Sequence, residues 1–257
     1  MIDLNKSIEL VKEWAYEAGK AQKDNYEKED LQISTKSSDI DLVTEIDDLS
    51  EKIIIKGIKR EYPDHDILSE ESEFEKTDSD YLWIIDPLDG TTNYAQGLPI
   101  FAVSIALEFR GKIVLGVVYN PMLDEMFSAV KGKGTYLNGK EIKIGGKDEL
   151  IKSVIATGFA YDRNTNENNN ISNFSKILPK VRGIRRMGAA AYDLACVACG
   201  RLDGYWEFNL KSWDVAAGIL IIKEAGGEVV DISGGKNVSI IAGNKKMIKL
   251  IEKEIKA

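Results

Sequence analysis

A short apolar stretch that ends in two aspartates constrains this 257-residue chain more than any other segment. Residues 81–85 predict a buried strand, and the sequence Asp86-Pro87-Leu88-Asp89-Gly90-Thr91-Thr92-Asn93 follows it directly. Open α/β sheets bind ligands at the carboxyl ends of their strands, where these carboxylates would lie. Two aspartates three residues apart in a proline-stiffened turn can converge on a hard divalent cation. Gly90 permits close backbone approach, and the amides that follow it can bind an anion.

The same residues are also typical of an ordinary turn, because Asp-Pro and Asp-Gly dipeptides are common where a chain reverses. Three further acidic segments favour a metal site. Asp41 and Asp47 lie six positions apart, Glu70 and Glu71 follow an apolar pair, and Asp214 begins an apolar helix. Each alone is typical of a helix cap or a solvated acid. Their recurrence beside a Gly-Thr turn, in a chain with one histidine, predicts a site for several magnesium ions.

The residue counts exclude several other kinds of catalysis. A single histidine, His65, rules out zinc sites and phosphatases that need two or three histidines. The chain has no Gly-x-Ser-x-Gly sequence, and neither cysteine is followed by an arginine six positions later. Carboxylates must therefore carry most of any chemistry.

Charge and hydropathy bear on partners and location. The chain has 34 Lys and Arg residues against 42 Asp and Glu residues, and the net charge of −8 disfavours a basic face for nucleic acid or anionic lipid. The N-terminus lacks the pattern of a secretory signal, and no apolar stretch approaches the roughly 20 residues of a membrane span. We therefore expect a cytoplasmic protein with no membrane partner and no direct contact with nucleic acid.

Hydrophobic periodicity predicts a mixed α/β chain without internal repeats or a linker. We expect a single domain over residues 1–257, with two closely packed lobes at roughly 1–145 and 146–257. Asp48 and Glu51 resemble a capping box for the second helix, and residues 33–39 are expected to form an exposed loop. Helices are expected at residues 4–25, 48–58, 171–178, 189–199, 215–225 and 245–256, and strands at 81–85, 101–109, 113–119, 126–129, 134–137, 154–157, 227–230 and 239–242.

Three weaker motifs have simpler interpretations. Residues 39–43 fit the Asp-x-Asp pattern of haloacid-dehalogenase-type phosphatases, but a polar segment precedes them where a buried strand is required. Residues 134–140 have P-loop spacing, yet Asn138-Gly139 indicates a two-residue hairpin turn. Cys196 and Cys199 fall inside a predicted helix, which favours buried small side chains over a redox pair.

The motifs together resemble the inositol monophosphatase family of magnesium-dependent, lithium-sensitive phosphatases. The resemblance extends over about residues 4–255. It implies a layered αβαβα sandwich with mixed sheets, of the inositol monophosphatase and fructose-1,6-bisphosphatase type, two to three Mg²⁺ ions and a homodimer. The segments that carry it are residues 41–47, 70–72, 83–93, 188–191, 213–218 and 226–227.

The same resemblance implies a metal-binding role for the acidic residues. One Mg²⁺ would be bound by Glu70, Asp86 and the backbone carbonyl of Leu88, and a second by Asp86, Asp89 and Asp214. Glu70 would also help to hold a third ion. Thr91, paired with Asp47, would orient the attacking water while Glu70 assists its deprotonation. Asp41 and Lys36, the latter on a mobile loop, would support the site.

Contacts with the substrate are also implied by the resemblance. The matching positions are Asp89, Gly90, Thr91, Arg185, Gly188, Ala189, Glu207 and Asp214. Ala189 stands where Ser or Thr is common, so only a backbone contact is expected there. From the residues alone, Glu207 is equally compatible with a solvated surface acid. Residues 162–170 do not align, and no substrate residue is assigned among them.

The resemblance implies hydrolysis of myo-inositol monophosphate to myo-inositol and phosphate. Related enzymes of the same fold act on fructose 1,6-bisphosphate, 3'-phosphoadenosine 5'-phosphate, NADP or histidinol phosphate, and these substrates stay open. Arg185 and Arg186 are candidates for contact with a second phosphate. A binding role is also open, because a bacterial relative acts as a transcription-complex factor.

Overall fold

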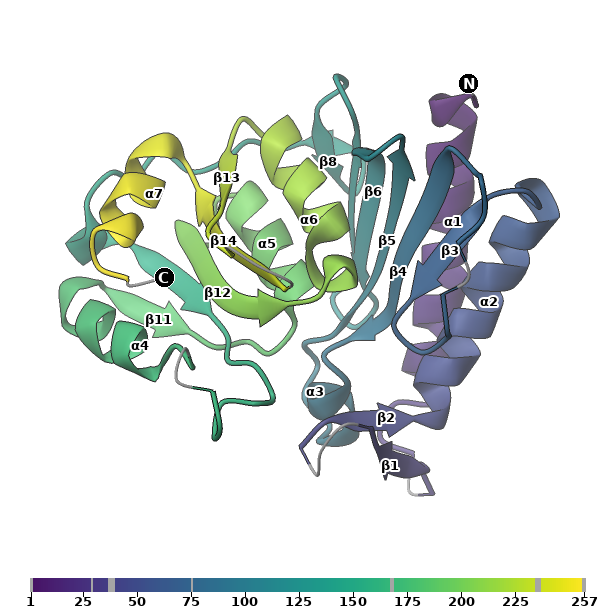
Figure 1. Ribbon diagram of the computed structural model, residues 1–257, viewed down its shortest axis with the longest axis horizontal. Coiled ribbons are helices and arrows are strands. Elements are labelled where there is room, and N and C mark those ends of the chain that lie inside the picture. The colour runs from purple at the N-terminus through teal and green to yellow at the C-terminus, as the bar shows by residue number, and fades with distance from the viewer. Residues whose placement is uncertain are drawn as a thin grey trace.

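Two mixed β-sheets, separated by a pair of helices, arrange the chain in layers (Figure 1). The computed structural model describes residues 2–28, 30–36, 40–74, 76–166, 169–233 and 237–255. From right to left in Figure 1, the layers are helices α1 and α2, the seven-stranded sheet, helices α5 and α6, the five-stranded sheet, and helices α4 and α7. This is the predicted αβαβα arrangement. The helices are α1 (Leu4–Asp24), α2 (Glu45–Glu61), α3 (Thr91–Ala95), α4 (Ile171–Ile177), α5 (Ala190–Ala198), α6 (Ser212–Glu224) and α7 (Lys245–Glu252).

The seven-stranded sheet runs in the order β3-β4-β5-β6-β7-β8-β9, and only the β3–β4 pair is parallel. Because consecutive strands pair, most of this sheet is a meander of hairpins. The predicted hairpin of strands around Arg110-Gly111 is present, with both residues at positive φ. Its strands are β3 (Asp66–Ser69), β4 (Tyr81–Asp89), β5 (Ala102–Phe109), β6 (Lys112–Asn120), β7 (Glu125–Val130), β8 (Thr135–Leu137) and β9 (Lys140–Glu141).

The five-stranded sheet has the order β11-β10-β12-β14-β13, with β10 parallel to both of its neighbours. The remaining pairs are antiparallel. Its strands are β10 (Val154–Thr157), β11 (Gly183–Arg185), β12 (Gly204–Leu210), β13 (Glu228–Asp231) and β14 (Val238–Gly243). A separate ribbon of β1 (Ile33–Thr35) and β2 (Leu42–Thr44) lies with α3 below the seven-stranded sheet in Figure 1.

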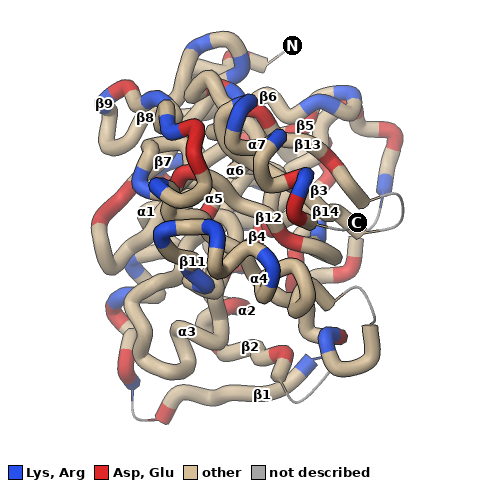
Figure 2. The backbone as a smooth tube through the Cα atoms, turned by 90° about the vertical axis from the view of Figure 1, so that its left-hand side faces the viewer, with Lys and Arg blue, Asp and Glu red and all other residues tan. Residues whose placement is uncertain are grey.

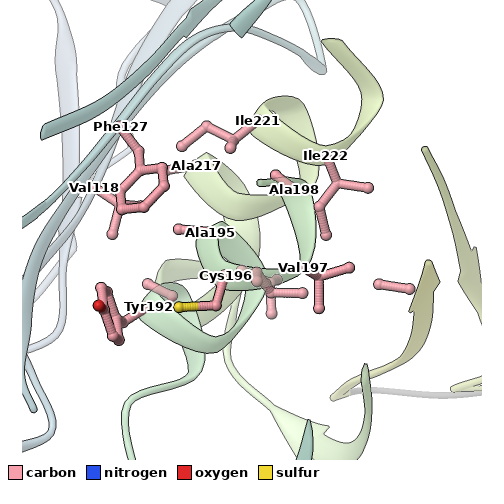
Figure 3. Close-up of a cluster of buried hydrophobic side chains, with 14 of the residues drawn as sticks. Val118, Phe127, Tyr192, Ala195, Cys196, Val197, Ala198, Ala217, Ile221 and Ile222 are labelled. Atoms are coloured by element: carbon pink, nitrogen blue, oxygen red, sulfur yellow. The ribbon is translucent and has the colours of Figure 1, made fainter. Parts of the chain in front are cut away.

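The middle helices are apolar on all sides because both of their faces are covered by a sheet. Figure 3 shows Ala195 and Cys196 of α5 and Ala217 and Ile221 of α6 close to Phe127 of the seven-stranded sheet. Small side chains allow the layers to approach closely. A Cβ atom at Gly116 of β6 would lie 3.0 Å from the backbone of Ala217, so this position must remain glycine.

The outer helices are amphipathic and bury one face each. Helices α1 and α2 cover the outer face of the seven-stranded sheet, where Trp14 occupies the space beside Gly57. Helices α4 and α7 cover the five-stranded sheet with Ile177, Met247 and Ile251. Among the described residues, no helix combines the length and the apolar character that crossing a bilayer needs. Basic and acidic segments are interspersed over the face that Figure 2 presents.

Local details of the N-terminal region differ from the expectations. Helix α2 begins at Glu45, three residues earlier than predicted, because Thr44 and Asp47 form the capping box. Glu51 instead accepts a hydrogen bond from Ser72, so the predicted Asp48–Glu51 box is wrong. Residues 33–35 form the exposed strand β1 rather than a loop, paired with β2. The residues 37–39, part of that loop and of the Asp-x-Asp pattern, lie outside the described residues, as do 167–168 and 256.

Other local expectations are confirmed. Asn138 and Gly139 have φ values of 49° and 78° and connect β8 to β9 as a tight hairpin. Gly200 and Gly226 have positive φ just after α5 and α6. Cys196 is buried inside α5 and Cys199 ends it, and both thiols are free.

Candidate active site

The aspartates of the central motif lie within a strand rather than after it. Strand β4 continues to Asp89, and its pairing with β5 shifts between Asp86 and Asp89. Pro87 lacks an N–H group and is tolerated in a strand at such an irregularity. The bulge is stabilised locally, because the backbone N–H of Leu88 donates to Asp86 Oδ1 at 3.1 Å. Both carboxylates are buried by the layers on either side.

Gly90 turns the chain from β4 into α3 with a backbone that other residues avoid. Its φ is 97°, and a Cβ atom there would lie 3.1 Å from the carbonyl oxygen of Ile100 and 3.2 Å from that of Gly188. Both the torsion and the close approach therefore require glycine. The turn places Thr91 at the first position of α3, directly beside the acidic strand end.

The hydrogen bond expected between Thr91 and Asp47 is present. Thr91 Oγ1 lies 2.8 Å from Asp47 Oδ1 and 3.1 Å from the carbonyl oxygen of Leu88. Thr44 donates to the other oxygen of Asp47 through its N–H and its hydroxyl, at 2.8 and 2.6 Å. Because a hydroxyl has a single proton, this arrangement directs the lone pairs of Thr91 away from Asp47. Thr91 can therefore accept a hydrogen bond from a water molecule in the cavity.

Lys36 forms ion pairs with both glutamates that follow β3. Its Nζ lies 2.8 Å from Glu70 Oε1 and also contacts Glu71 Oε1. Burial alone would lower the pKa of Lys36, but the two carboxylates raise it overall. Burial raises the pKa of Glu71 to about 7, against the opposing effect of Lys36. The ammonium group thus provides positive charge where the resemblance implies a metal ion.

Asp86 and Asp89 are buried, and the half-buried Asp214 lies near them. Burial raises the pKa of Asp86 well above its usual range, and the charges of Glu70, Asp89 and Asp214 raise it further. Burial and Glu70 likewise raise the pKa of Asp214, against the hydrogen bond from the N–H of Lys211. Buried carboxylates that repel one another are stable as anions only with a cation beside them.

Asp89 also caps helix α5 from a distant part of the chain. Its carboxylate accepts hydrogen bonds from the N–H groups of Ala190, Ala191 and Tyr192 at 2.9, 2.7 and 3.4 Å. Burial raises the pKa of Asp89 to about 7, and these amides oppose the shift. Ala189 at the N-cap position has no side-chain acceptor, and Asp89 satisfies the free amides in its place.

The donor set fits Mg²⁺ chemically, although its side chains are engaged with other partners. Glu70, Asp86, Asp89, Asp214 and the Leu88 carbonyl offer only oxygen atoms, which are the ligands that Mg²⁺ prefers. Within the described ranges, no three His, Cys, Asp or Glu side chains are spaced around one point as ligands of a single ion. Lys36 holds Glu70, while backbone amides hold Asp89 and Asp214. The carboxylates nevertheless raise one another's pKa, and a bound cation would relieve this repulsion.

These residues surround a cavity of about 510 Å³. Twelve of the fourteen residues predicted for the site line it: Lys36, Asp41, Glu70, Asp86, Leu88, Asp89, Gly90, Thr91, Gly188, Ala189, Glu207 and Asp214. Asp47 lies behind Thr91 and reaches the cavity through its hydrogen bond. Arg185 is the exception, because it ends the edge strand β11, is exposed and donates to the carbonyl of Ile184.

Glu207 is a buried cavity residue and not a solvated surface acid. It receives a hydrogen bond from Tyr205, and its carboxylate packs on Gly158, where a Cβ atom would lie 2.2 Å from Oε1. Burial raises the pKa of Glu207 to about 7, against the effects of Tyr205 and Arg186. Any side chain at position 158 would therefore displace the Glu207 carboxylate.

Two further lining residues, Asp193 and Tyr161, were not predicted from the sequence as contacts of the site. Asp193 extends from α5, and Tyr161 directly precedes residues 162–170, which do not align. Arg186, a candidate for contact with a second phosphate, lines the cavity in place of Arg185. Asp193 had a detectable signal, because it is the one acid in the apolar run 189–199. A charged residue inside a helix that is otherwise apolar indicates a function for that side chain.

A layered αβαβα fold with an acidic, oxygen-rich cavity between its sheets defines the class of metal-dependent phosphatases. The model of the inositol monophosphatase family matches residues 3–256, so the chain belongs to that family. It is 41% identical to inositol-1-monophosphatase of Mesorhizobium japonicum over 94% of this chain and 93% of the relative. It is 42% identical to Nus factor SuhB of Escherichia coli K12 over 91% of this chain and 90% of the relative.

Solved structures show the same likeness. The extragenic suppressor protein suhB of Bartonella henselae superposes with a TM-score of 0.90 at 41% identity, covering 97% of this chain and 98% of that one. Inositol monophosphatase from Anabaena superposes with a TM-score of 0.87 at 38% identity, covering 98% and 96%. These coverages span the full layered fold rather than one sheet of it.

Proposed function

We propose that this protein is a magnesium-dependent phosphomonoesterase that hydrolyses myo-inositol monophosphate to myo-inositol and phosphate. The observation that carries the proposal is the hydrogen bond from Thr91 to Asp47 beside the buried acids of β4. Membership of the inositol monophosphatase family supports the same reaction class.

The roles of the residues follow from their positions. Asp47 fixes the proton of Thr91, so the Thr91 oxygen can hold a water molecule in one orientation for attack. Glu70 lines the cavity in contact with Lys36 and accepts the proton that this water loses. The Gly90 and Thr91 amides would hold phosphate oxygens. When bound, Mg²⁺ would supply the positive charge that lets a phosphate dianion bind in this acidic cavity.

No covalent phosphoenzyme is needed in this scheme. The two cysteines and His65 are absent from the described residues that line the cavity. Cys196 is buried, and its pKa is raised to about 12 by burial, which disfavours the nucleophilic thiolate. Direct attack by water is therefore the step that these side chains can support.

A phosphate-release assay over a substrate panel tests this function. The panel contains myo-inositol 1-phosphate, fructose 1,6-bisphosphate, 3'-phosphoadenosine 5'-phosphate, NADP and histidinol phosphate, each with Mg²⁺ or with EDTA. We expect the inositol ester to be preferred, activity to vanish in EDTA and to return with added Mg²⁺. Full turnover in chelator would contradict the metal requirement, and a strong preference for a bisphosphate would overturn the assigned substrate.

A second role in transcription is supported by relatives named Nus factor SuhB at 42% identity. We propose it as an addition to catalysis, because both functions can reside on one chain if they use different surfaces. A variant without activity, Asp89→Asn, should then rescue some phenotypes of a deletion strain and fail to rescue others. Rescue of every phenotype would show that the binding role alone is sufficient.

We also propose a cytoplasmic homodimer that is inhibited by lithium, as the family resemblance implies. Light scattering of the purified protein should give twice the chain mass of 28.6 kDa. Lithium should lower turnover at fixed Mg²⁺, and cell fractionation should recover the protein with cytoplasmic markers. A monomeric mass, or turnover that is indifferent to lithium, would contradict the corresponding part of this proposal.

A further inference from the structure

Asp193 is a buried cavity residue with an unused hydrogen-bond acceptor. It lies on α5, directly after the three residues whose N–H groups donate hydrogen bonds to Asp89. Only 2% of its surface is exposed. Its Oδ1 atom has no hydrogen-bond partner among the described residues, although the side chain lines the cavity. A buried acceptor without a donor costs free energy. A donor supplied by a ligand would remove that cost.

The charged groups that face Asp193 come from three elements. Glu207 on β12 and Asp89 on β4 are acids, whereas Arg186 precedes α5 and is positive. Burial, Glu207 and Asp89 raise the pKa of Asp193 well above its usual range, and Arg186 opposes them. Arg186 is held close by Gly188, where a Cβ atom would lie 2.5 Å from Nη1. Asp193, Glu207 and Arg186 thus form one polar part of the cavity wall, which we call the polar floor.

We propose that Asp193 is a specificity residue whose free oxygen accepts a hydrogen bond from a hydroxyl group on the alcohol part of the substrate. The inference rests on the proposed function, and it restricts the substrate to monophosphates of polyhydroxylated alcohols. An alcohol without such hydroxyls leaves the Asp193 oxygen unpaired, which a buried site penalises strongly.

The same floor disfavours a second phosphate. A second dianion placed there would be repelled by Asp193 and Glu207 wherever they are ionised, and would require both acids to keep their protons. Either outcome lowers the binding free energy, and Arg186 alone cannot compensate for two carboxylates. Discrimination against bisphosphates therefore strengthens as the pH rises and these acids ionise, while recognition of hydroxyls comes from the acceptor oxygen of Asp193.

Two substitutions separate these contributions. Asp193→Asn keeps the volume and one acceptor oxygen but removes the charge, and Asp193→Ala removes both. kcat/KM is measured for myo-inositol 1-phosphate, propyl phosphate and fructose 1,6-bisphosphate. We expect Asp193→Ala to lose about tenfold or more on the inositol ester relative to propyl phosphate, mainly in KM. We expect Asp193→Asn to stay within about threefold on the inositol ester and, at alkaline pH where the wild-type acid ionises, to gain about tenfold on the bisphosphate relative to it.

A binding measurement makes the result independent of turnover. Calorimetric titration of the Mg²⁺-loaded protein with myo-inositol should show weaker binding by about tenfold in Asp193→Ala and little change in Asp193→Asn. Polyol binding of this kind in a protein that hydrolyses no phosphoester would uphold this inference and overturn the proposed function. A wild-type protein that binds no polyol would overturn the inference itself.

Asp203→Asn is the matched control. Asp203 is also buried, with 4% exposed, but it accepts from Lys147 and from the N–H of Val154 at 2.9 and 2.8 Å and does not line the cavity. Its substitution should lower the unfolding temperature without changing the ratio between substrates. Equal losses of Asp193→Ala on the inositol ester and on propyl phosphate, in a protein that unfolds at the wild-type temperature, would overturn the inference.

Discussion

The two sides of the cavity are built from the chain in different ways. One side comes from a continuous segment, residues 86–91, with Asp47 behind it. The other side is the polar floor, whose three residues come from β12, α5 and the segment before α5. The reaction needs fixed distances between several groups, and a continuous segment provides them. Recognition of an alcohol needs only donors and acceptors at suitable places, which single residues from separate elements can supply.

The largest effect is expected at Asp89, on the continuous side. Asp89→Asn removes an oxygen ligand and a negative charge, so kcat should fall by about 10³-fold. Phosphate release at saturating Mg²⁺ measures the effect. The control is Asp80→Asn, because Asp80 is exposed and pairs with Arg110 outside the cavity. A loss below tenfold at Asp89 would remove the functional contrast between the two sides.

The next effect is expected at Thr91. Thr91→Val removes the hydroxyl that Asp47 orients and should lower kcat by about 10²-fold. Thr91→Ser keeps the hydroxyl and should retain most of the activity. Steady-state kinetics of both variants separate the hydroxyl from the shape of the side chain. Similar losses in Thr91→Ser and Thr91→Val would show that the methyl group, rather than the hydroxyl that holds the water, matters here.

The polar floor should respond to pH through Glu207. Its pKa of about 7 exceeds the ordinary 4.5, so the folded protein retains a proton that the unfolded chain releases. The stability that this proton contributes is complete below pH 4.5 and is lost as the pH rises through 7. The full difference is on the order of 3 kcal/mol, equivalent to about 5–10 °C in Tm for a chain of this size.

Thermal unfolding in EDTA from pH 5 to 8 checks this expectation. Glu207→Gln is neutral throughout, so its Tm should rise relative to the wild type across this range. Parallel profiles of the two proteins would mean that Glu207 ionises in the folded state as freely as in water. Glu207 would then behave as a solvated acid, which is the alternative that the sequence left open.

The smallest effect is expected at His65, which belongs to neither side. Its ring stacks between Tyr62 and Tyr81 and accepts a hydrogen bond from Trp83 Nε1 at 3.1 Å. Burial lowers the pKa of His65, against Asp64 and Asp66, so the neutral ring is favoured in the folded state. Stability is therefore complete above pH 6.5 and declines as the pH falls below it.

Comparison with His65→Asn measures this effect, because Asn retains an acceptor but does not titrate. Between pH 7 and 5.5 the wild type should lose more in Tm than the variant. Activity at pH 7 should be the same in both proteins. A larger change in activity than in Tm would connect this ring to the cavity.

The continuous side could be predicted because its signals are local. Apolar residues before Asp86, a glycine after Asp89 and a threonine at the next position all fall within one short segment. The start of α2 was missed although its signal is also local, because two overlapping capping boxes were possible and burial of Asp47 decided between them. Propensity alone does not distinguish such neighbours.

The polar floor could be predicted only in part, because its contacts are not local. Glu207 was assigned by resemblance, but its burial depends on Gly158, about 50 residues away in the sequence. Arg185 and Arg186 are adjacent, and only the path of the chain after β11 decides which of them lines the cavity. Asp89 caps α5 from about 100 residues away, and no local sequence pattern at either position predicts this contact.

That capping has a consequence for how sequences of such proteins are interpreted. The carboxylate of Asp89 anchors the middle layer to the seven-stranded sheet, whatever reaction takes place beside it. A related protein without phosphatase activity would still need this aspartate, because the first turn of α5 would otherwise lose its cap. The presence of this aspartate in a sequence is therefore weak evidence for an active enzyme. A residue whose side chain makes no contact that stabilises the fold would be stronger evidence.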